Sequence, residues 1–583
     1  MTYRAPQSDL LATMAYARMA NGLPDDREDA APVLAQAAQF AEGVLAPLDR
    51  VGDRHGVTLD HTGVHVAPGW AGAYRAWIDG GWNGLAAPEA AGGSGLSHSL
   101  NAACFEIWSG ANLSFALAGL LTAGAIEALD RHGSPELRRL YLPRLVSGAW
   151  PGTMNLTEPQ AGSDLGALRC RAERADDGTY RLFGQKIYIT YGDHDMAENI
   201  LHLVLARLPD APPGTRGLSL FLVPKRLLGP EGEAGAANDL RCIGLEAKLG
   251  QHGAPTCTMV FGDRTGAVGH LIGTEHKGLA CMFTMMNNAR LSVGLEGVAA
   301  AEHATQKAVA HARARRQGRD GGSGPGMAPI IRHPDVGRML LIMKSATAAA
   351  RCLCALTAAA LDAAEPDSEA GRQAAHRAAL LTPVAKAWST DLANEIASLG
   401  IQVHGGSGYI EATGAAQIAR DIRIAAIYEG TNGIQAIDLV SRKLSLDGGA
   451  AVSRELAGMR AIVTQLATCP DPGLVVAGAS LGQAVDELER CVAWLGRLAP
   501  DRSSEALAVA TPFLRLFGIA CGGTALAGLA FSSSCEAAAR AVALTRAFAA
   551  FLAPEAIGLG RIIRHGGAML GDNPEAWLGA LTD

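Results

Sequence analysis

One carboxylate that could take part in catalysis lies in the segment Ile427–Gly433. There Glu429 follows Tyr428 and precedes a glycine and a threonine. A glutamate can act as a general base, although a lone glutamate in such surroundings is more often a surface or capping residue. The segment Gln402–Tyr409 lies upstream and contains two adjacent glycines, which let the backbone approach a phosphate or a flat ring. Because adjacent glycines also end ordinary helices, neither segment assigns a chemistry by itself.

Two further windows combine hydroxyl groups with glycine or an aromatic ring. Met154–Asp164 carries Thr157 and Ser163, whose hydroxyls on a glycine-containing turn could bond the polar edge of a ring and its pyrophosphate. In Lys186–Thr190, strand alternation would place Tyr188 and Thr190 on one face, where they could pack against such a ring. An ordinary turn and an ordinary sheet surface are the alternatives.

The elements that must position these windows follow a helix, sheet, helix order. Helical spacing dominates from about residue 31 to 150, and long helical periodicity returns from about 277 to 444. Between them the period changes, and turn residues separate short strands that we expect at Thr179–Phe183, Ile187–Thr190, Leu201–Leu205 and Leu218–Leu222. After residue 449 about 130 further residues resemble another Ala-rich helical unit by their loop and helix signals.

The sequence therefore predicts a mainly α chain with a central β-domain, divided into five segments. They are an N-terminal extension (1–30), a helical N-terminal domain (31–150), a β-domain on the flavin and substrate side (151–275), a helical domain with the glutamate (276–446) and an additional C-terminal helical domain (447–583). No internal repeat or low-complexity tail is visible, so all segments after the extension are expected to fold.

Composition limits the class of protein. The chain has 583 residues, 49% of them hydrophobic and 18% charged, with abundant Ala and Gly that favour closely packed helices. A net charge of -7 argues against nucleic acid as the main partner. No spacing typical of a metal site occurs, and the N-terminus lacks a secretory signal. We expect a cytoplasmic protein without a membrane partner, and we interpret the uncharged stretch Leu516–Cys535 as a buried helix.

The eleven cysteines form no Cys-x-x-Cys pair. An odd number of cysteines without metal-ligand spacing is typical of reduced thiols in a protein core. We therefore expect neither a disulfide framework nor a zinc site.

Together, these windows in this order and at these distances closely resemble the acyl-CoA dehydrogenase family over about residues 31–444. Tyr3–Pro6 followed by Asp9, with the additional C-terminal unit, resembles the longer bacterial branch of the family that includes methylmercaptopropionyl-CoA dehydrogenases. The resemblance implies a helical N-domain, a β-barrel-like middle domain and a helical-bundle C-domain.

The resemblance also implies FAD as the cofactor and a set of residues that bind it. Arg315 matches an arginine that reaches the FAD of a neighbouring subunit, and Gln402 begins a loop that approaches the same cofactor. Tyr188 stands where the family most often has Trp, and Gly433 where many relatives carry Gln. The implied cofactor-binding residues are Leu156, Thr157, Gly162, Ser163, Tyr188, Thr190, Arg315, Gln402, Gly405, Gly406 and Thr431.

Glu429 matches the catalytic base of the family. Some members place the acid just before an arginine of a later helix, and here that position, before Arg290, is Ala289. The positions that match substrate contacts are Ser163, Asn287, Arg290 and Gly430. Enclosure by apolar helix faces is expected to raise the pKa of Glu429 toward neutrality.

The implied reaction is α,β-dehydrogenation of an acyl-CoA thioester to the trans-2-enoyl-CoA, with electrons passed to an electron-transferring flavoprotein. An acyl-CoA oxidase that uses oxygen is one alternative, and a flavin-containing or DNA-associated relative without catalysis is another. Because Arg315 and the Gln402 loop match positions that serve a neighbour's FAD, we expect a homodimer or a higher homo-oligomer. The acyl group stays open.

Overall fold

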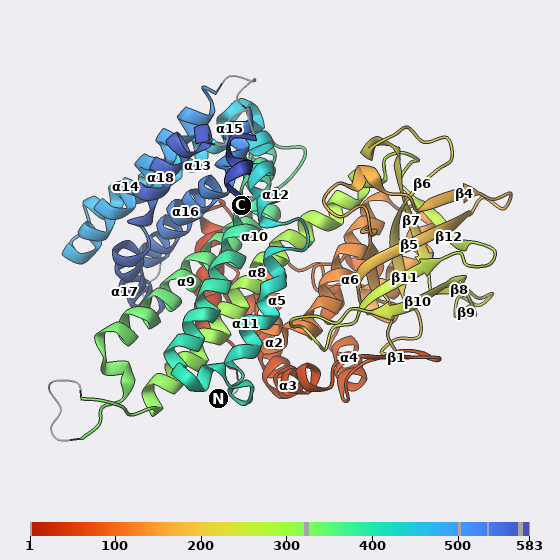
Figure 1. The fold of residues 1–583 in the computed structure, drawn as a ribbon, viewed down its shortest axis with the longest axis horizontal. Helices are drawn as coiled ribbons and strands as arrows, with labels where there is room; N and C mark the ends of the chain where they lie inside the picture. The colour runs from red at the N-terminus through yellow and green to blue at the C-terminus, as the bar shows by residue number, and fades with distance from the viewer. Residues whose placement is uncertain (1–2, 320–325, 499–502, 533–535, 570–574, 582–583) are drawn as a thin grey trace.

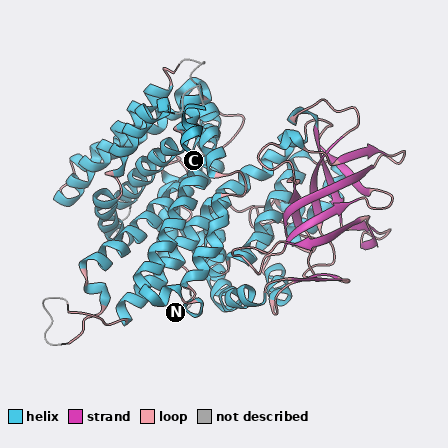
Figure 2. Cartoon of the chain, in the orientation of Figure 1, coloured by secondary structure: helices cyan, strands magenta, loops and turns pink. Residues whose placement is uncertain are grey.

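The computed structural model describes the chain except for residues 1–2, 320–325, 499–502, 533–535, 570–574 and 582–583. A large helical body adjoins a separate β-domain, and the added C-terminal helices lie on the side of the body away from that domain (Figure 1 and Figure 2). The first helices are α1 (Gln7–Met19), α2 (Arg27–Phe40), α3 (Ala46–His55), α4 (Trp70–Asp79), α5 (His98–Ala111), α6 (Leu113–His132) and α7 (Pro135–Ser147), with a small hairpin of β1 (Thr58–Asp60) and β2 (Gly63–His65).

The β-domain is built on one eight-stranded sheet in the order β10-β11-β5-β12-β7-β6-β3. Strand β4 pairs with both β5 and β6, so the pairing returns on itself through β5, β12, β7 and β6 and closes a barrel. This closure confirms the β-barrel-like prediction. The strands are β3 (Gly152–Asn155), β4 (Arg171–Arg174), β5 (Tyr180–Thr190), β6 (Leu201–Arg207), β7 (Leu218–Pro224), β8 (Arg226–Leu228), β9 (Ala234–Ala237), β10 (Leu240–Leu245), β11 (Thr256–Phe261) and β12 (Ala267–Ile272).

The expectation of separate strands at Thr179–Phe183 and Ile187–Thr190 was wrong, because residues 180–183 and 187–190 belong to one continuous strand, β5. Gly184, which suggested a turn, stays in the ladder opposite Phe261 with a φ of 143°. A Cβ at this glycine would lie 3.0 Å from the backbone of Cys170 on the neighbouring chain segment. The glycine therefore serves a close approach of two segments, which a local pattern does not distinguish from a turn.

The central helices carry the remaining predicted site residues. They are α8 (Gly278–Ala314), α9 (Pro334–Asp362), α10 (Glu369–His404), α11 (Ala415–Ile422) and α12 (Asn432–Asp438). Helix α8 lies directly on α10 at two glycines. A Cβ on Gly294 would lie 2.8 Å from the Ala385 carbonyl oxygen, and one on Gly297 would lie 2.7 Å from the Ser389 carbonyl oxygen. The two backbones touch there, as the Ala- and Gly-rich composition predicted.

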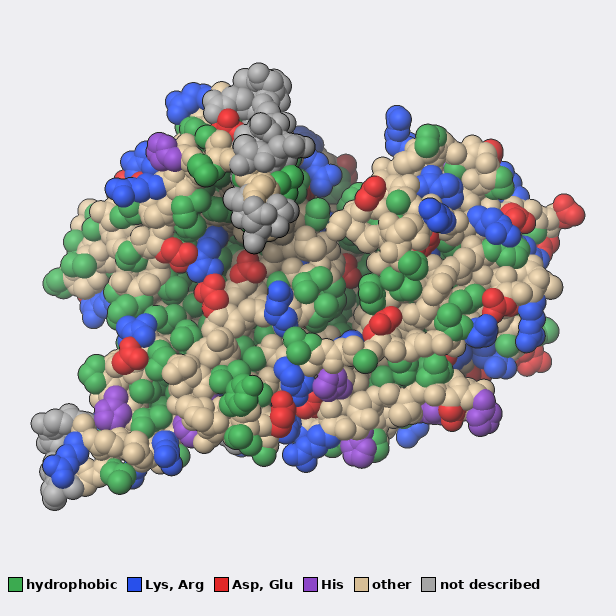
Figure 3. All heavy atoms as spheres, in the orientation of Figure 1, with side chains coloured by type: hydrophobic (Ala, Val, Ile, Leu, Met, Phe, Trp, Pro, Cys, Tyr) green, Lys and Arg blue, Asp and Glu red, His purple; other side chains and the backbone are tan. Residues whose placement is uncertain are grey.

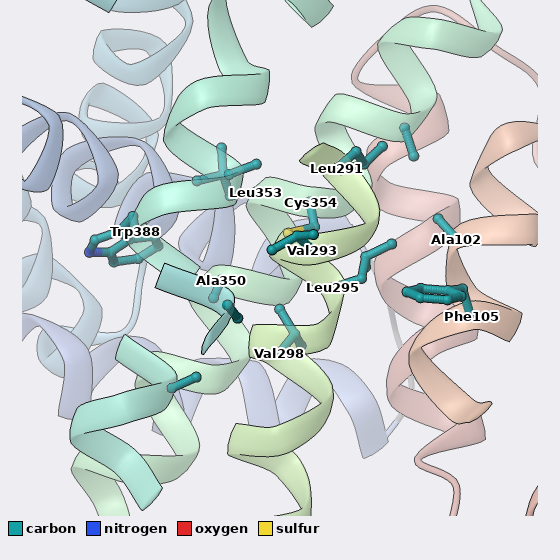
Figure 4. Close-up of a cluster of buried hydrophobic side chains, with 14 of the residues drawn as sticks. Ala102, Phe105, Leu291, Val293, Leu295, Val298, Ala350, Leu353, Cys354 and Trp388 are labelled. Carbon is teal, nitrogen blue, oxygen red and sulfur yellow. The ribbon is translucent and has the colours of Figure 1, made fainter. Parts of the chain in front are cut away.

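The C-terminal unit is helical, as expected, and docks on the central helices. Trp388 of α10 is buried (Figure 4), and its ring lies where a Cβ on Gly518 or Gly522 would have to lie. The helices of this unit are α13 (Ala450–Ala467), α14 (Pro472–Leu495), α15 (Ser503–Ala508), α16 (Ala510–Ser532), α17 (Glu536–Phe551), α18 (Glu555–Gly566) and α19 (Glu575–Leu578).

Three of the described helices are long and apolar enough to cross a membrane by length and composition, and a bent pair at 537–569 would make a fourth. These three are α6, α9 and α16, and between 78% and 94% of their apolar windows is buried inside the protein. Helix α16 has the highest buried share and covers most of the stretch Leu516–Cys535. The interpretation of that stretch as a buried helix is confirmed for the residues that the structure describes.

The N-terminal extension is tied to both helical units. Asp9 of α1 pairs with Lys344 of α9 at 3.4 Å and with Arg540 of α17 at 2.8 Å. Beneath it, the buried guanidinium of Arg351 on α9 pairs with Glu106 of α5 at 2.7 Å and with Glu302 of α8 at 2.9 Å. Removing one partner of a buried ion pair leaves the other charge buried and unpaired, which costs free energy. This network therefore fixes the relative positions of the helices.

The docking of the C-terminal unit on Trp388 is testable with Gly→Ala substitutions at two different positions. Gly522→Ala is expected to lower the free energy of unfolding by about 1–3 kcal/mol, because the new methyl group collides with a rigid ring. Gly558→Ala, on an exposed face of α18 with open space around it, is expected to raise it by up to about 1 kcal/mol, because alanine favours a helix. Thermal unfolding midpoints that move in the same direction would contradict this packing.

Candidate active site

Glu429 lies on a strained backbone between a 3₁₀ turn (Arg423–Ala426) and α12. Its φ is 56°, in the left-handed region, and that of Gly430 is 87°. Helix α12 begins directly afterwards, and the Thr431 hydroxyl oxygen caps it by accepting a hydrogen bond from the Ile434 amide at 3.2 Å. A left-handed conformation is costly for a glutamate and persists only where the surroundings fix it, which is common at active sites.

Three side chains from three helices hold the backbone of this segment. The Glu429 carbonyl oxygen accepts hydrogen bonds from Arg290 Nε of α8 at 3.4 Å and from Gln435 Nε2 of α12 at 3.3 Å. The carbonyl of the next residue, Gly430, accepts a bond from Lys386 Nζ of α10 at 3.0 Å. Lys386 and Gln435 are fully buried, so these donors have no competing water.

The surroundings of Glu429 set its acidity. Its side chain is half-buried, and burial raises its pKa to about 7, while the positive charges of Arg290 and Lys386 act in the opposite direction. The expectation of a pKa near neutrality is confirmed. Burial lowers the pKa of Lys386 to about 8, although the Glu429 charge opposes this shift. A carboxylate with a pKa near the working pH is suited to general base catalysis.

The structure brings most of the predicted substrate residues to Glu429. Arg290 donates from its second guanidinium nitrogen to Asn287 Oδ1 at 3.2 Å while it contacts the backbone of Glu429. Gly430 follows directly along the chain, and a Cβ there would lie 3.8 Å from the Arg290 guanidinium. Ser163 lies on another segment, after β3, and is exposed.

The two hydroxyl-bearing windows meet in the β-domain. The Ile187 amide of β5 donates to the Thr157 carbonyl oxygen at 2.9 Å, and the Thr153 hydroxyl donates to the Thr190 carbonyl oxygen at 2.7 Å. The turn after β3 therefore lies along the end of β5. The predicted residues Leu156, Thr157, Tyr188 and Thr190 form one surface of the β-domain.

A buried ion pair, which the sequence did not reveal, fixes this arrangement. Lys186 and Glu158 are 0% and 4% exposed, and their Nζ and Oε1 atoms lie 2.9 Å apart. Lys186 also donates to the Leu156 carbonyl oxygen at 2.9 Å, and Glu158 accepts from the Arg169 and Cys170 amides. Both residues stood inside the windows, but only the fold shows that a lysine of one window neutralises a glutamate of the other.

Tyr188 lies at a bulge of β5. Opposite β11, the register shifts between Cys257 and Met259, and Tyr188 has a left-handed φ of 60°. Its ring is 60% exposed, which is unusual for a large aromatic side chain. Bulges commonly redirect a side chain next to an active site, and here an aromatic face is left open for a ligand.

Several hydroxyls on this surface are free to bind a ligand. Within the residues that the structure describes, the hydroxyls of Thr157, Ser163, Tyr188 and Thr190 form no hydrogen bond to protein. A Cβ on Gly162 would meet nothing within 4 Å, so the turn is open on that side. Figure 3 shows the surface hollowed between the β-domain and the helical body, with charges of both signs interspersed. Exposed donors beside an open aromatic face fit a flat ligand with a polar edge.

Of the remaining predicted cofactor residues, Thr431 lies beside Glu429 as the cap of α12, whereas the other four lie elsewhere. Arg315 caps the C-terminal end of α8 and is exposed, as are Gln402, Gly405 and Gly406 at the end of α10. The His311 and His404 rings stack at 4.4 Å, so these two helix ends are neighbours. Arg315 lies 25 positions after Arg290 along α8 and its cap, which corresponds to about 37 Å at the helical rise per residue. Within one chain, Arg315 and the neighbouring end of α10 therefore lie far from Arg290 and the Glu429 backbone that it contacts.

The sequence did not predict several other residues of the site. Lys386 and Gln435 hold the segment of Glu429, and Glu296 of α8 accepts a hydrogen bond from the Tyr428 hydroxyl. A buried charged residue on an otherwise apolar helix face was the available signal. In the described residues, the ten cysteines are free, and no group of three or more His, Cys, Asp or Glu side chains could hold a metal ion.

Comparison with known protein families covers most of the chain. Residues 27–149, 153–264 and 276–444 match the N-terminal, middle and C-terminal domains of acyl-CoA dehydrogenases. Residues 456–572 match a domain described as acetyl-CoA dehydrogenase C-terminal like. The additional helical unit is therefore also found in other proteins.

Individual proteins agree with the family match. The chain is 46% identical over 469 residues to 3-methylmercaptopropionyl-CoA dehydrogenase of Ruegeria pomeroyi, covering 78% of each chain. Its fold is similar to Caenorhabditis elegans ACDH-11 in complex with C11-CoA (TM-score 0.77, 23% identity, 93% of this chain and 91% of that one). It is also similar to a Bacillus anthracis acyl-CoA dehydrogenase complexed with FAD (TM-score 0.74, 20% identity, 95% and 90%). The chain belongs to the acyl-CoA dehydrogenase family.

Proposed function

We propose that this protein dehydrogenates an acyl-CoA thioester to the trans-2-enoyl-CoA with bound FAD, and that Glu429 removes the α-proton. The observation that carries the proposal is the left-handed Glu429, with a pKa near 7, held between Arg290 and Lys386. Family membership and the likeness to proteins named for acyl-CoA dehydrogenation support the same reaction.

The β-domain surface fits the isoalloxazine and pyrophosphate parts of FAD. Tyr188 offers an open aromatic face, and the free hydroxyls of Thr157, Ser163 and Thr190 offer donors and acceptors for a polar ring edge. Arg315 and the Gln402–Gly406 loop would bind the FAD of a neighbouring subunit. Bound FAD would supply the acceptor for the β-hydrogen, which leaves as a hydride.

A thioester α-carbon is a very weak acid, and groups of the chain itself would help to remove its proton. The Glu429 carboxylate takes the proton, and a negative charge develops on the thioester oxygen. The Glu429 backbone amide makes no hydrogen bond to the described residues, so it is free to donate to that oxygen. One preorganised donor of this kind contributes about 3 kcal/mol. Arg290 and Asn287, beside Glu429, are placed to bind polar groups of the thioester.

The role of Glu429 predicts the behaviour of Glu429→Gln. This variant should bind FAD and acyl-CoA normally but reduce the flavin several orders of magnitude more slowly, because an amide cannot accept the proton. Anaerobic stopped-flow absorbance of the flavin measures the rate. Glu198→Gln, an exposed control, should leave the rate unchanged. Near-normal reduction by Glu429→Gln would refute the assignment.

The pKa of Glu429 predicts a pH dependence. The base is active when ionised, so kcat/KM should fall about tenfold per pH unit below about pH 7 and level off above it. Arg290→Gln should move the acidic limb of this pH profile to higher pH, because the Arg290 charge lowers the pKa of Glu429. A limb that stays in place, or moves to lower pH, would show that Arg290 does not act on the base.

The electron acceptor distinguishes a dehydrogenase from an oxidase. We propose an electron-transferring flavoprotein as the acceptor. After anaerobic reduction by an acyl-CoA, the flavin should therefore reoxidise slowly in air and rapidly when that flavoprotein is added. Fast reoxidation by oxygen would identify the oxidase, and absence of reduction by every acyl-CoA would favour the non-catalytic alternative.

The acyl group is proposed from the same relatives. The match to a 3-methylmercaptopropionyl-CoA dehydrogenase favours a short thioester in which a sulfur atom can replace a methylene group. Comparing flavin bleaching by 3-methylmercaptopropionyl-CoA with straight, branched and long acyl-CoA thioesters tests this choice. Preference for a long or branched chain would overturn it.

We further propose a cytoplasmic homodimer or higher homo-oligomer that shares its FAD sites. Arg315→Ala should lower FAD content and weaken FAD binding, because it removes a cation that would meet the cofactor of the neighbouring subunit. Arg313→Ala, two residues earlier and also exposed, should retain FAD. Analytical ultracentrifugation with flavin detection reports both properties. A wild-type monomer that retains FAD would contradict the shared site.

A further inference from the structure

A second carboxyl group lies beside the segment that carries Glu429. Glu296 of α8 is 0% exposed, and its Oε2 atom accepts a hydrogen bond from the hydroxyl of Tyr428, the residue directly before Glu429. Its Oε1 atom is also buried and has no hydrogen-bond partner among the described residues. Buried polar atoms are nearly always bonded, so this carboxyl group needs a physical explanation.

The packing around Glu296 prevents it from escaping to solvent. Gly294 and Gly297 flank it on α8, and at both glycines the backbone of α10 approaches so closely that a Cβ would collide with it. The charged and titratable groups that act on Glu296 are Tyr428 and Glu429 from the segment before α12 and Lys386 from α10. Lys386 is engaged by Gly430 and Asn432. Glu296 therefore has no cation of its own in the described structure.

Ionisation of Glu429 opposes ionisation of its neighbour Glu296. Burial raises the pKa of Glu296 to about 8, and the charge of Glu429 raises it further, against the Tyr428 hydrogen bond and the Lys386 charge. The pKa of Glu429 is about 7. Arg290 and Lys386 favour the ionised form of Glu429, and a negative charge on Glu429 favours the neutral form of Glu296.

We propose that Glu296 is a positioning residue for the base: it stays a neutral carboxylic acid while Glu429 is ionised, and its bond to Tyr428 holds the left-handed backbone of Glu429. This inference rests on the proposed role of Glu429 as the base. Tyr428 secures the segment from the N-terminal side, and Arg290, Gln435 and Lys386 secure it from the other. A strained conformation needs such support from both sides.

Two substitutions of Glu296 test whether its function needs a neutral hydrogen-bonding group or a negative charge. Glu296→Gln keeps the size and a hydrogen-bond acceptor but is always neutral, so the flavin should be reduced by acyl-CoA at pH 7 within about threefold of the wild-type rate. Glu296→Leu removes the bond to Tyr428 and should slow reduction about tenfold. Tyr428→Phe should slow it equally, and the double variant no further, because both changes remove one bond.

Independent measurements separate positioning from general damage to the fold. Thr305→Val removes another buried hydroxyl of α8 and should leave the rate unchanged. FAD content and the unfolding midpoint should be retained in Glu296→Leu. Infrared difference spectra of wild type against Glu296→Gln at pH 7 should show the C=O band of a protonated carboxylic acid in wild type only. This band reports the proton without turnover.

The outcomes distinguish this inference from the proposed function. If Glu296→Gln is as slow as Glu296→Leu, or if the infrared band is missing, Glu296 acts as a charge and the inference is wrong. If Glu296→Leu keeps the wild-type rate while Glu429→Gln does not, Glu296 positions nothing although Glu429 is still the base. If Glu429→Gln reduces the flavin normally, the proposed function itself fails.

Discussion

The direct contact between α8 and α10 is the constraint on which the site depends. At Gly294 and Gly297 no side chain separates the two backbones. Arg290 and Glu296 of α8 are close enough to Lys386 of α10 for their charges to affect its pKa. The segment of Glu429 lies against both helices and is bonded to residues of each. A wider spacing would admit water, and the pKa of Glu429 would fall toward that of an ordinary glutamate.

The β-domain differs from the helical body in that it leaves the proposed binding surface exposed. Its closed barrel buries an apolar interior, and the Lys186–Glu158 pair anchors the turn after β3 to β5. The bulge at Tyr188 then presents an aromatic ring to solvent. Rigid strands thus support a surface whose hydroxyls remain unpaired within the described protein. The helical body carries Glu429, the proposed base, and the β-domain carries the surface that the proposed cofactor would cover.

The sequence alone was sufficient for the order of domains and the buried character of α16, and it led to the prediction of Glu429 as the base. Periodicity changes from helical to strand spacing and back because core-facing residues repeat differently in the two structures. Glu429 was predicted because the order and spacing of the sequence windows resemble the acyl-CoA dehydrogenase family, in which this position carries the base and the rival position is here Ala289. Its role as the base and the cofactor residues remain predictions.

Only the tertiary structure decided which polar groups meet. Lys186 and Glu158, Lys386 and Gly430, and Glu296 and Tyr428 are pairs separated by 28, 44 and 132 residues, and no local pattern links them. The same holds for Gly184, which marks a turn in the sequence and a close approach in the fold. Local propensity depends on neighbours along the chain, whereas acidity and strain depend on neighbours in space. The sequence predicted Glu429 as the base, and the packing of α8 on α10 surrounds this residue with the groups that set its pKa.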